Sequence, residues 1–179
     1  VPHGRRYSYG PKEWAELLLK VANPDHRGPR RVYTGIGKVD ELIEGLGPGQ
    51  LMLVAARPGV GKTSILQQAA LYNLSLGHGV AFFSVEMTGE DMAKRQLSQE
   101  ARIPMRAFYQ GLSEEQWAKV QEVVGTSAEA NWHFQHGGFT TLSIANACDL
   151  IPDLSLVVVD YVQLLDDKYG HTENDRVGY

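Results

Sequence analysis

The stretch QLMLVAARPGVGKT occupies residues 50–63 and decides the fold class. Its first part, residues 50–55, is a continuous apolar run, which is typical of a strand buried on both faces of a parallel sheet. A glycine-rich turn follows and leads into an expected helix from Lys62 to Leu76, which Gly77 should end. A buried strand, a glycine-rich turn and a helix in this order predict a phosphate-binding loop.

The residue types of this loop suit a triphosphate. Gly59 and Gly61 allow the backbone N–H groups to curl toward phosphate oxygens, and the next helix presents its positive end to the same anion. Lys62 can neutralise the outer phosphates, and the Thr63 hydroxyl can ligate magnesium. The usual pattern begins with glycine, where this chain has Ala56. The alternative is a glycine-rich turn that contains Lys-Thr by chance. The candidate nucleotide-binding residues are Ala56, Arg57, Pro58, Gly59, Val60, Gly61, Lys62, Thr63 and Ser64.

Acidic residues follow two further apolar runs. Glu86 comes after an expected strand at residues 80–85, and Asp160 comes after an expected strand at residues 154–159. A carboxylate at the Asp160 position can hold magnesium through its water shell, and one at the Glu86 position can orient and deprotonate an attacking water. Ordinary polar strand ends are the alternative interpretation for both residues.

The rest of the chain alternates in the same way. We expect a short strand at residues 131–135 and helices at 11–22, at 88–101, from Ser113 onward and at 141–151. Alternating strands and helices predict an α/β fold with a mainly parallel sheet and helices on both faces. We expect residues 1–31 to form a basic leader that includes the helix at 11–22, and residues 32–179 to form the nucleotide-binding domain, incomplete at its C-terminal end. Ligands of such folds bind beyond the carboxyl ends of the strands, where all the candidate residues fall.

Composition excludes several classes of protein. The chain has 179 residues, a single cysteine and a net charge of −4. One cysteine allows neither an intrachain disulfide nor a cysteine-based zinc site, and no apolar run is long enough to cross a bilayer, so we expect a cytoplasmic protein. Residues 1–38 carry eight basic and three acidic residues, which favours contact with an acidic surface or a phosphate backbone. A solvated tail is the alternative.

Five segments occur in the order of one family: residues 33–63, FFSVEM at 82–87, RQLSQEARIP at 95–104, GLSEEQW at 111–117 and VVVDYVQLL at 157–165. On these segments the chain resembles the carboxyl-terminal ATPase domain of DnaB-type replicative DNA helicases, within the RecA-like class of P-loop NTPases. The Ala-Arg-Pro opening of the loop is common in this family, so Ala56 supports the resemblance.

The resemblance implies a role for each matching residue. ATP and Mg²⁺ are the implied cofactors. Lys62 and Thr63 would bind the phosphates and the metal, with Glu86 as catalytic base and Asp160 as the metal-organising aspartate. Gln163 lies in the Asp-Tyr-x-Gln-Leu segment near Asp160, and Arg95 is similar to a helical arginine beside the nucleobase.

The resemblance also implies partners. The family hydrolyses ATP as a homo-hexameric ring that translocates on single-stranded DNA, and the helix at 11–22 resembles the linker helix that docks on a neighbouring subunit. Primase and a helicase loader are further suggested partners, and no membrane is implied. The family's sheet has one more strand, later in sequence, between the phosphate-loop strand and the Asp160 strand. The chain stops 19 residues after Asp160. We therefore expect a fragment of a longer protein that does not unwind DNA alone.

Two other functions remain open from the sequence. The first is another RecA-like ATPase, such as a recombinase or a RadA-like repair protein, although Phe-Ser-x-Glu-Met together with Asp-Tyr-x-Gln-Leu is not expected there. The second is a nucleotide-binding assembly module that does not hydrolyse ATP, against which the presence of Glu86 argues.

Overall fold

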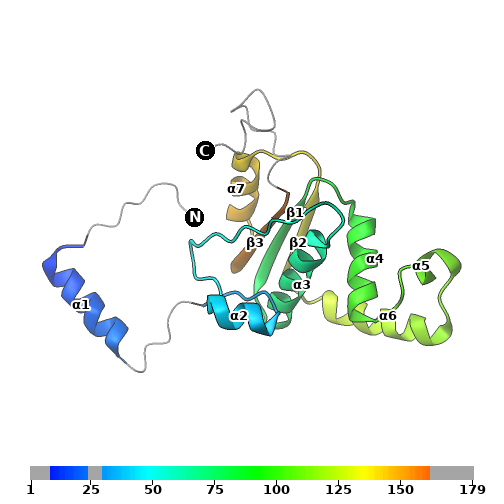
Figure 1. Cartoon of the computed structure of the whole chain (residues 1–179), viewed down its shortest axis with the longest axis horizontal. Coiled ribbons are helices and arrows are strands. Elements are labelled where there is room, and N and C mark those ends of the chain that lie inside the picture. Colours follow the sequence, from blue (N-terminus) through cyan, green and yellow to red (C-terminus); the bar gives the residue numbers. More distant parts are fainter. Residues whose placement is uncertain (1–8, 24–29, 162–179) are drawn as a thin grey trace.

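A computed structural model of the chain describes residues 9–23 and 30–161 (Figure 1). Its core is a three-stranded sheet in the order β2-β1-β3, formed by Trp132–His136, Gly79–Ser84 and Leu154–Asp160. Both strand pairs are parallel, with Phe82 opposite Phe134 on one side and Val158 on the other. The predicted α/β architecture with a parallel sheet is confirmed.

Helices cover both faces of this sheet, as predicted. On one face, Ala70 of α3 (Lys62–Ser75) and Met92 of α4 (Gly89–Glu100) pack against Phe82 and Val158. On the other face, Ile144 of α7 (Thr141–Asp149) packs against Ala81 and Phe83. Because successive strand residues point to opposite faces, Phe82 and Phe83 each belong to a different core. All six residues of β1 are buried, which places this strand at the centre of the described domain.

Side-chain caps explain where the helices begin. The Thr88 hydroxyl accepts from the Asp91 amide at 3.2 Å, and Ser113 and Gln116 form a reciprocal capping box ahead of α6 (Glu114–Ser127). Such caps satisfy amide groups that lack a partner within the helix. Gly77 follows α3 with φ of 75°, a backbone conformation that favours glycine. The helix starts expected at Thr88 and Ser113 are confirmed.

Two short helices were not predicted. In α2 (Gly37–Ile43), Asp40 accepts from the amides of Thr34 at 2.7 Å and Gly35 at 2.9 Å, and it thereby fixes the turn that precedes the helix. A Cβ atom on Gly35 would lie 2.8 Å from the Tyr72 ring on α3, so only glycine fits this close approach. The other is α5 (Ala107–Gln110), a single turn between α4 and α6.

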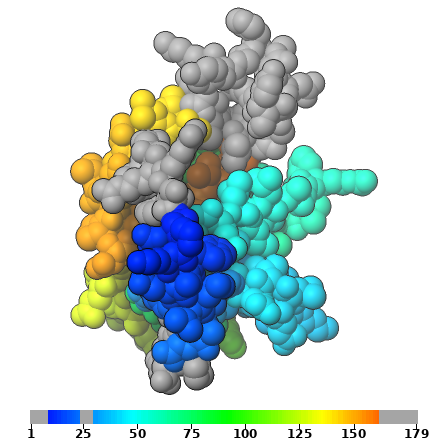
Figure 2. All heavy atoms as spheres, turned by 90° about the vertical axis from the view of Figure 1, so that its left-hand side faces the viewer, coloured from blue at the N-terminus to red at the C-terminus, as the bar shows by residue number. Residues whose placement is uncertain are grey.

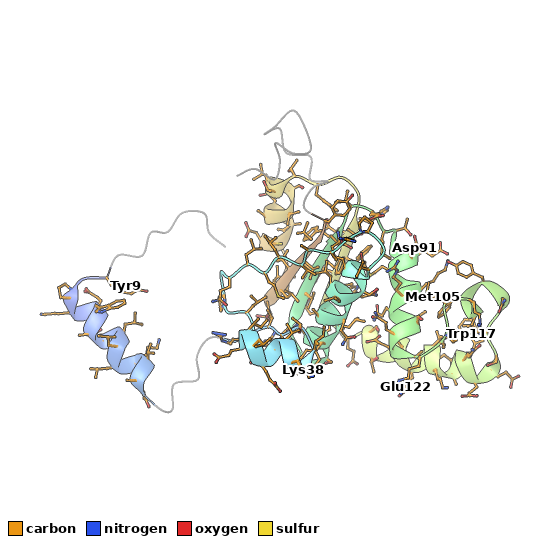
Figure 3. The ribbon with its side chains drawn as sticks, viewed as in Figure 1. Tyr9, Lys38, Asp91, Met105, Trp117 and Glu122 are labelled. Atoms are coloured by element: carbon orange, nitrogen blue, oxygen red, sulfur yellow. The ribbon has the colours of Figure 1, made fainter. Side chains whose placement is uncertain are left out.

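The helices α4, α5 and α6 share a small apolar core of their own. Ala101, Ile103, Ala107 and Val120 are buried there together. Figure 3 labels Trp117 on α6, and its side chain is exposed on the part of the molecule farthest from α1. This helical lobe is joined to the sheet through α4, whose Met92 also packs against Phe82 and Val158.

The predicted helix at residues 11–22 is confirmed as α1 (Pro11–Ala22). None of its residues is buried, and Figure 1 shows it apart from the sheet. Figure 2 places it toward the viewer on the surface of the molecule. Trp14 is 53% exposed, and Leu18, Leu19 and Val21 are exposed more strongly. The division of the chain at residue 31 into a leader and a domain stays a prediction.

The prediction of a buried strand at residues 50–55 is wrong for this structure. The run has no strand assignment, and Leu51 and Leu53 are 83% and 74% exposed. The physical reason is the lack of a hydrogen-bonding neighbour, because an extended chain becomes a strand only when its N–H and C=O groups pair with another strand. In the described residues, β3 pairs with β1 on one side, and no strand joins its other edge.

None of the helices within the described ranges combines the length and the apolar character that crossing a bilayer requires.

Candidate functional site

The predicted phosphate loop is an exposed turn that ends where α3 begins. The Val60 amide donates to the Arg57 carbonyl oxygen at 3.3 Å, which closes the turn. Gly59 and Gly61 have φ of 77° and 104°, in the left-handed region that side chains other than hydrogen disfavour. Gly61 is the N-cap residue of α3 and offers no side chain to its amides. The first N–H groups of α3 are therefore not taken by a capping side chain and can receive an anion.

Asp160 meets this loop from the carboxyl end of β3. The Thr63 hydroxyl donates to Asp160 Oδ2 at 2.6 Å, and Lys62 Nζ lies 3.4 Å from Asp160 Oδ1. Thr63 and Asp160 are 97 positions apart in the sequence, so only the fold brings them together. The Asp160 side chain is 2% exposed. A buried carboxylate is stable only when it is paired, and Lys62 and Thr63 supply that pairing.

The position of Asp160 follows from the register of the sheet. Asp160 lies opposite Ser84, and the Val85 amide donates to the Asp160 carbonyl oxygen at 2.9 Å. Pairing with β1 therefore fixes the position of the Asp160 side chain along the sheet. Asp160 Oδ1 is buried and accepts no hydrogen bond from the described residues.

Glu86 follows β1 at the same edge of the sheet. The Met87 amide donates to the Ser84 hydroxyl at 2.9 Å, and the Met87 side chain is buried in the core. These two anchors hold the turn between β1 and α4, and they leave the Glu86 side chain exposed. Because Ser84 pairs with Asp160, both carboxylates belong to the edge where the phosphate loop lies. The structure thus places the predicted acids at one edge, and their catalytic roles stay predictions.

The remaining predicted residues are less closely tied to the loop. Ser64 follows Thr63 in the first turn of α3. Arg95 lies on α4 and is partly exposed, and within residues 9–23 and 30–161 no hydrogen bond or ion pair joins it to the phosphate loop. Gln163 lies outside the described residues.

Sequence reasoning missed Tyr161. Lys62 Nζ lies 4.0 Å from the centre of the Tyr161 ring, so the ammonium group faces the ring as well as Asp160. The signal that was available is its position: Tyr161 directly follows Asp160, at the end of a strand that reaches the phosphate loop.

The donor set fits Mg²⁺ bound together with a nucleotide. Magnesium prefers oxygen ligands and keeps several of its waters, so one hydroxyl and one nearby carboxylate suffice beside phosphate oxygens. Thr63 supplies the hydroxyl, and Asp160 Oδ1, which accepts no hydrogen bond from the described residues, supplies an acceptor for a metal-bound water. Among the described residues, no three or more His, Cys, Asp or Glu side chains form a group that could hold a metal ion.

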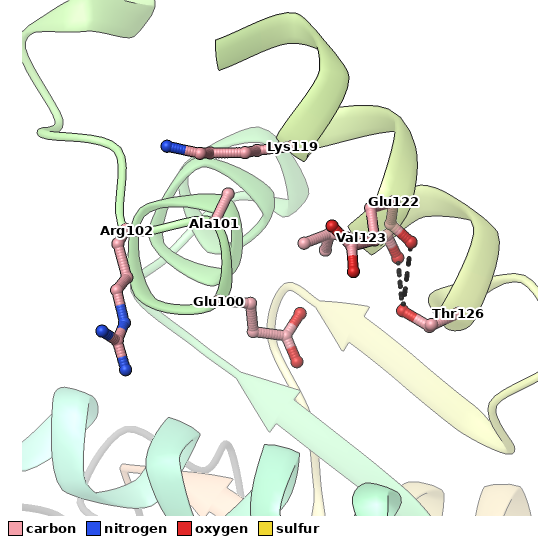
Figure 4. Close-up of a pocket in the computed structure, with 7 residues that line it drawn as sticks. All are labelled: Glu100, Ala101, Arg102, Lys119, Glu122, Val123 and Thr126. Atoms are coloured by element: carbon pink, nitrogen blue, oxygen red, sulfur yellow. Dashed lines mark hydrogen bonds between the residues drawn. The ribbon is translucent and has the colours of Figure 1, made fainter. Parts of the chain in front are cut away.

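A hollow of about 380 Å³ lies elsewhere, between the end of α4 and α6 (Figure 4). Its acidic and basic side chains are balanced, so it has no net charge to attract a triphosphate. The Thr126 hydroxyl is already bound to the backbone, at 3.0 Å from the Val123 carbonyl oxygen. The lining residues are Glu100, Ala101, Arg102, Lys119, Glu122, Val123 and Thr126.

The family model described as the DnaB-like helicase C terminal domain matches residues 31–178. The chain belongs to this family. The match includes the phosphate loop, Glu86 and Asp160, so the residues that meet at the edge of the sheet are part of the DnaB-like domain.

Curated relatives agree with this assignment. The DnaB-like domain is 32% identical over 165 residues to the replicative DNA helicase DnaB of Haemophilus influenzae, covering 86% of this chain and 34% of that protein. It is 30% identical over 151 residues to the replicative DNA helicase DnaC of Bacillus subtilis, covering 81% of this chain and 33% of that protein. The chain thus spans about a third of the length of these relatives.

Solved structures confirm the RecA-like fold expected of the DnaB-like domain. One solved ATPase domain superposes with a TM-score of 0.80 at 20% identity, covering 93% of this chain and 62% of that chain. A DnaB-like replicative helicase, described with its interactions with primase, superposes with a TM-score of 0.79 at 21% identity and covers 93% of this chain and 43% of that chain.

Proposed function

We propose that this DnaB-like domain is the ATP-hydrolysing motor of a replicative DNA helicase, which works as a homo-hexameric ring on single-stranded DNA. The observation that carries the proposal is the meeting of Lys62 and Thr63 with the buried carboxylate of Asp160. A purely structural glycine-rich turn has no need of a buried acid at the start of its helix. Among nucleotide-binding domains, the family assignment favours a helicase domain.

The chain's own residues divide the chemistry among them. The open amides at the start of α3 and the Lys62 ammonium group bind phosphate oxygens and neutralise their charge. The Thr63 hydroxyl and the Asp160 carboxylate hold Mg²⁺, which when bound withdraws charge from the transferring phosphoryl group. Glu86 orients a water molecule and accepts its proton, and its exposed side chain is accessible to that water. Arg95 and Gln163 are proposed contacts of the nucleotide.

Assembly into a ring is proposed through α1. A helix with no buried residue and with Trp14, Leu18, Leu19 and Val21 exposed leaves an apolar surface in water, which a second copy of the chain can cover. Primase and a helicase loader are proposed partners of the whole protein, and the cytoplasm is its proposed location.

The test of the proposed function uses the full-length protein and three measurements. Lys62→Ala should abolish ATP binding, because it removes the only cation that the described residues place beside Asp160. Glu86→Gln should keep ATP binding but lower single-turnover hydrolysis about 10²- to 10⁴-fold, the range typical of a general base. Wild-type protein should unwind a forked duplex, and both variants should not.

The alternatives give other results in the same measurements. A recombinase or a RadA-like repair protein would exchange strands and leave the forked duplex intact. A nucleotide-binding assembly module would hydrolyse ATP equally slowly in the wild-type protein and in the Glu86→Gln variant.

A further inference from the structure

The Lys62 ammonium group is shared between two neighbours on adjacent residues. It lies 3.4 Å from Asp160 Oδ1 and 4.0 Å from the centre of the Tyr161 ring. We propose that Tyr161 is a positioning residue, whose ring face holds this ammonium group short of Asp160 and keeps both charges available to an incoming Mg²⁺–nucleotide. This inference rests on the proposed function, because it assigns a task within the same site.

The distances indicate that the Lys62 ammonium group interacts with both Asp160 and Tyr161 and forms a full hydrogen bond with neither. A fully formed hydrogen bond between an ammonium group and a carboxylate measures about 2.7–2.9 Å, shorter than the 3.4 Å seen here. Asp160 Oδ1 is buried and accepts no hydrogen bond from the described residues, although Lys62 has three donors nearby. An aromatic ring attracts a cation within about 6 Å of its centre, and Tyr161 meets that condition.

Burial makes this sharing effective. Lys62 is 26% exposed and Asp160 is 2% exposed, so water cannot solvate the ammonium group freely on the Asp160 side. Attraction between charges and to ring faces is stronger where water is excluded. Without the ring, the same ammonium group would be drawn onto Oδ1 as its nearest partner.

The consequence concerns nucleotide affinity. If Lys62 closed fully on Asp160, the incoming nucleotide would have to break a buried, charge-assisted hydrogen bond before both groups could serve it. Tyr161 prevents that closure, so the lysine and the carboxylate remain an ion pair at 3.4 Å without a direct hydrogen bond between them. A flat ring face at position 161 is the feature required, and the tyrosine hydroxyl is not.

The test measures the affinity of the full-length protein for a fluorescent, non-hydrolysable ATP analogue in the presence of Mg²⁺. Tyr161→Phe should bind within about twofold of wild type, because the ring face remains. Tyr161→Leu keeps an apolar side chain without a ring, and it should bind roughly 3- to 30-fold more weakly. Phenylalanines carrying one, two and three fluorine atoms at position 161 should weaken binding stepwise, since fluorine withdraws charge from the ring face while the shape is nearly unchanged.

Two results would overturn the proposal. One is a Tyr161→Leu protein that binds as tightly as wild type or more tightly, and the other is equal affinity across the fluorinated series. If the Leu variant does not fold, the fluorinated series decides alone, because it hardly changes packing. Lys62→Ala separates this inference from the proposed function. If Lys62→Ala also binds normally, the nucleotide site itself is wrong and the inference falls with it; if only Lys62→Ala loses binding, Tyr161 has no positioning role.

Discussion

Replacing Thr63 by valine tests the contact between the phosphate loop and β3 without any nucleotide. Valine keeps the branched shape of threonine but removes the hydroxyl that donates to Asp160 Oδ2 at 2.6 Å. Asp160 is 2% exposed and its Oδ1 already lacks a hydrogen bond within the described part of the chain, so the carboxylate would lose its one hydrogen-bond donor. A buried charged acceptor left in this way costs about 2 kcal/mol. For a domain of this size that unfolds as one unit, that loss lowers the Tm of the domain's own transition by about 4–8 °C.

The matched control is Thr63→Ser, which keeps the hydroxyl and should cost less than about 1 kcal/mol. Thermal and urea unfolding of the full-length protein measure both variants. A double-mutant cycle with Asp160→Ala, which removes the acceptor, isolates the pair, and we expect a coupling free energy of about 1–2 kcal/mol. The reasoning is refuted if the two changes add within about 0.5 kcal/mol, or if serine is as damaging as valine.

Three further predictions concern other parts of the chain. Deleting residues 1–22 should lower the particle mass measured by light scattering, because the exposed apolar side of α1 is removed. The far-ultraviolet circular dichroism of the remaining domain should be retained, because its core is untouched. An unchanged particle mass would disprove docking through α1. The single change Leu18→Glu should act in the same direction, with Lys12→Gln, also on α1, as the matched control that makes the same change of −1 in net charge without removing an apolar side chain. Burial, and then the nearby Arg30 guanidinium, lower the pKa of His78 below 6.5, so the unfolded chain takes up the proton first as the pH falls. Stability should therefore be full above pH 6.5, decline below it and level off under the folded pKa, and His78→Asn should flatten that decline in urea titrations; an unaltered slope would exclude His78 as its source.

Most of the fold could be predicted because its determinants are local. Apolar runs predicted β1 and β3, and the capping residues Thr88 and Ser113 predicted the starts of α4 and α6, which the structure confirms. The approach of Thr63 to Asp160 could also be expected, since both lie at the carboxyl edge of one sheet.

The errors have a common cause in contacts that the local sequence does not encode. Residues 50–55 have the composition of a buried strand, but a strand also requires a paired neighbour, and the described sheet provides none. The α2 helix depends on Asp40 accepting from the amides of Thr34 and Gly35, a contact formed only after the chain turns. The position of Tyr161 directly after Asp160 is visible in the sequence, but the approach of its ring to Lys62 exists only in three dimensions.

The most direct test of the account is an experimental structure of the full-length protein with Mg²⁺ and a non-hydrolysable ATP analogue. The account predicts phosphate oxygens on the amides of residues 59–63, the metal beside Thr63 and Asp160, and Glu86 facing the terminal phosphate. A nucleotide bound in the hollow between α4 and α6, or a Glu86 side chain turned away from the phosphates, would contradict it.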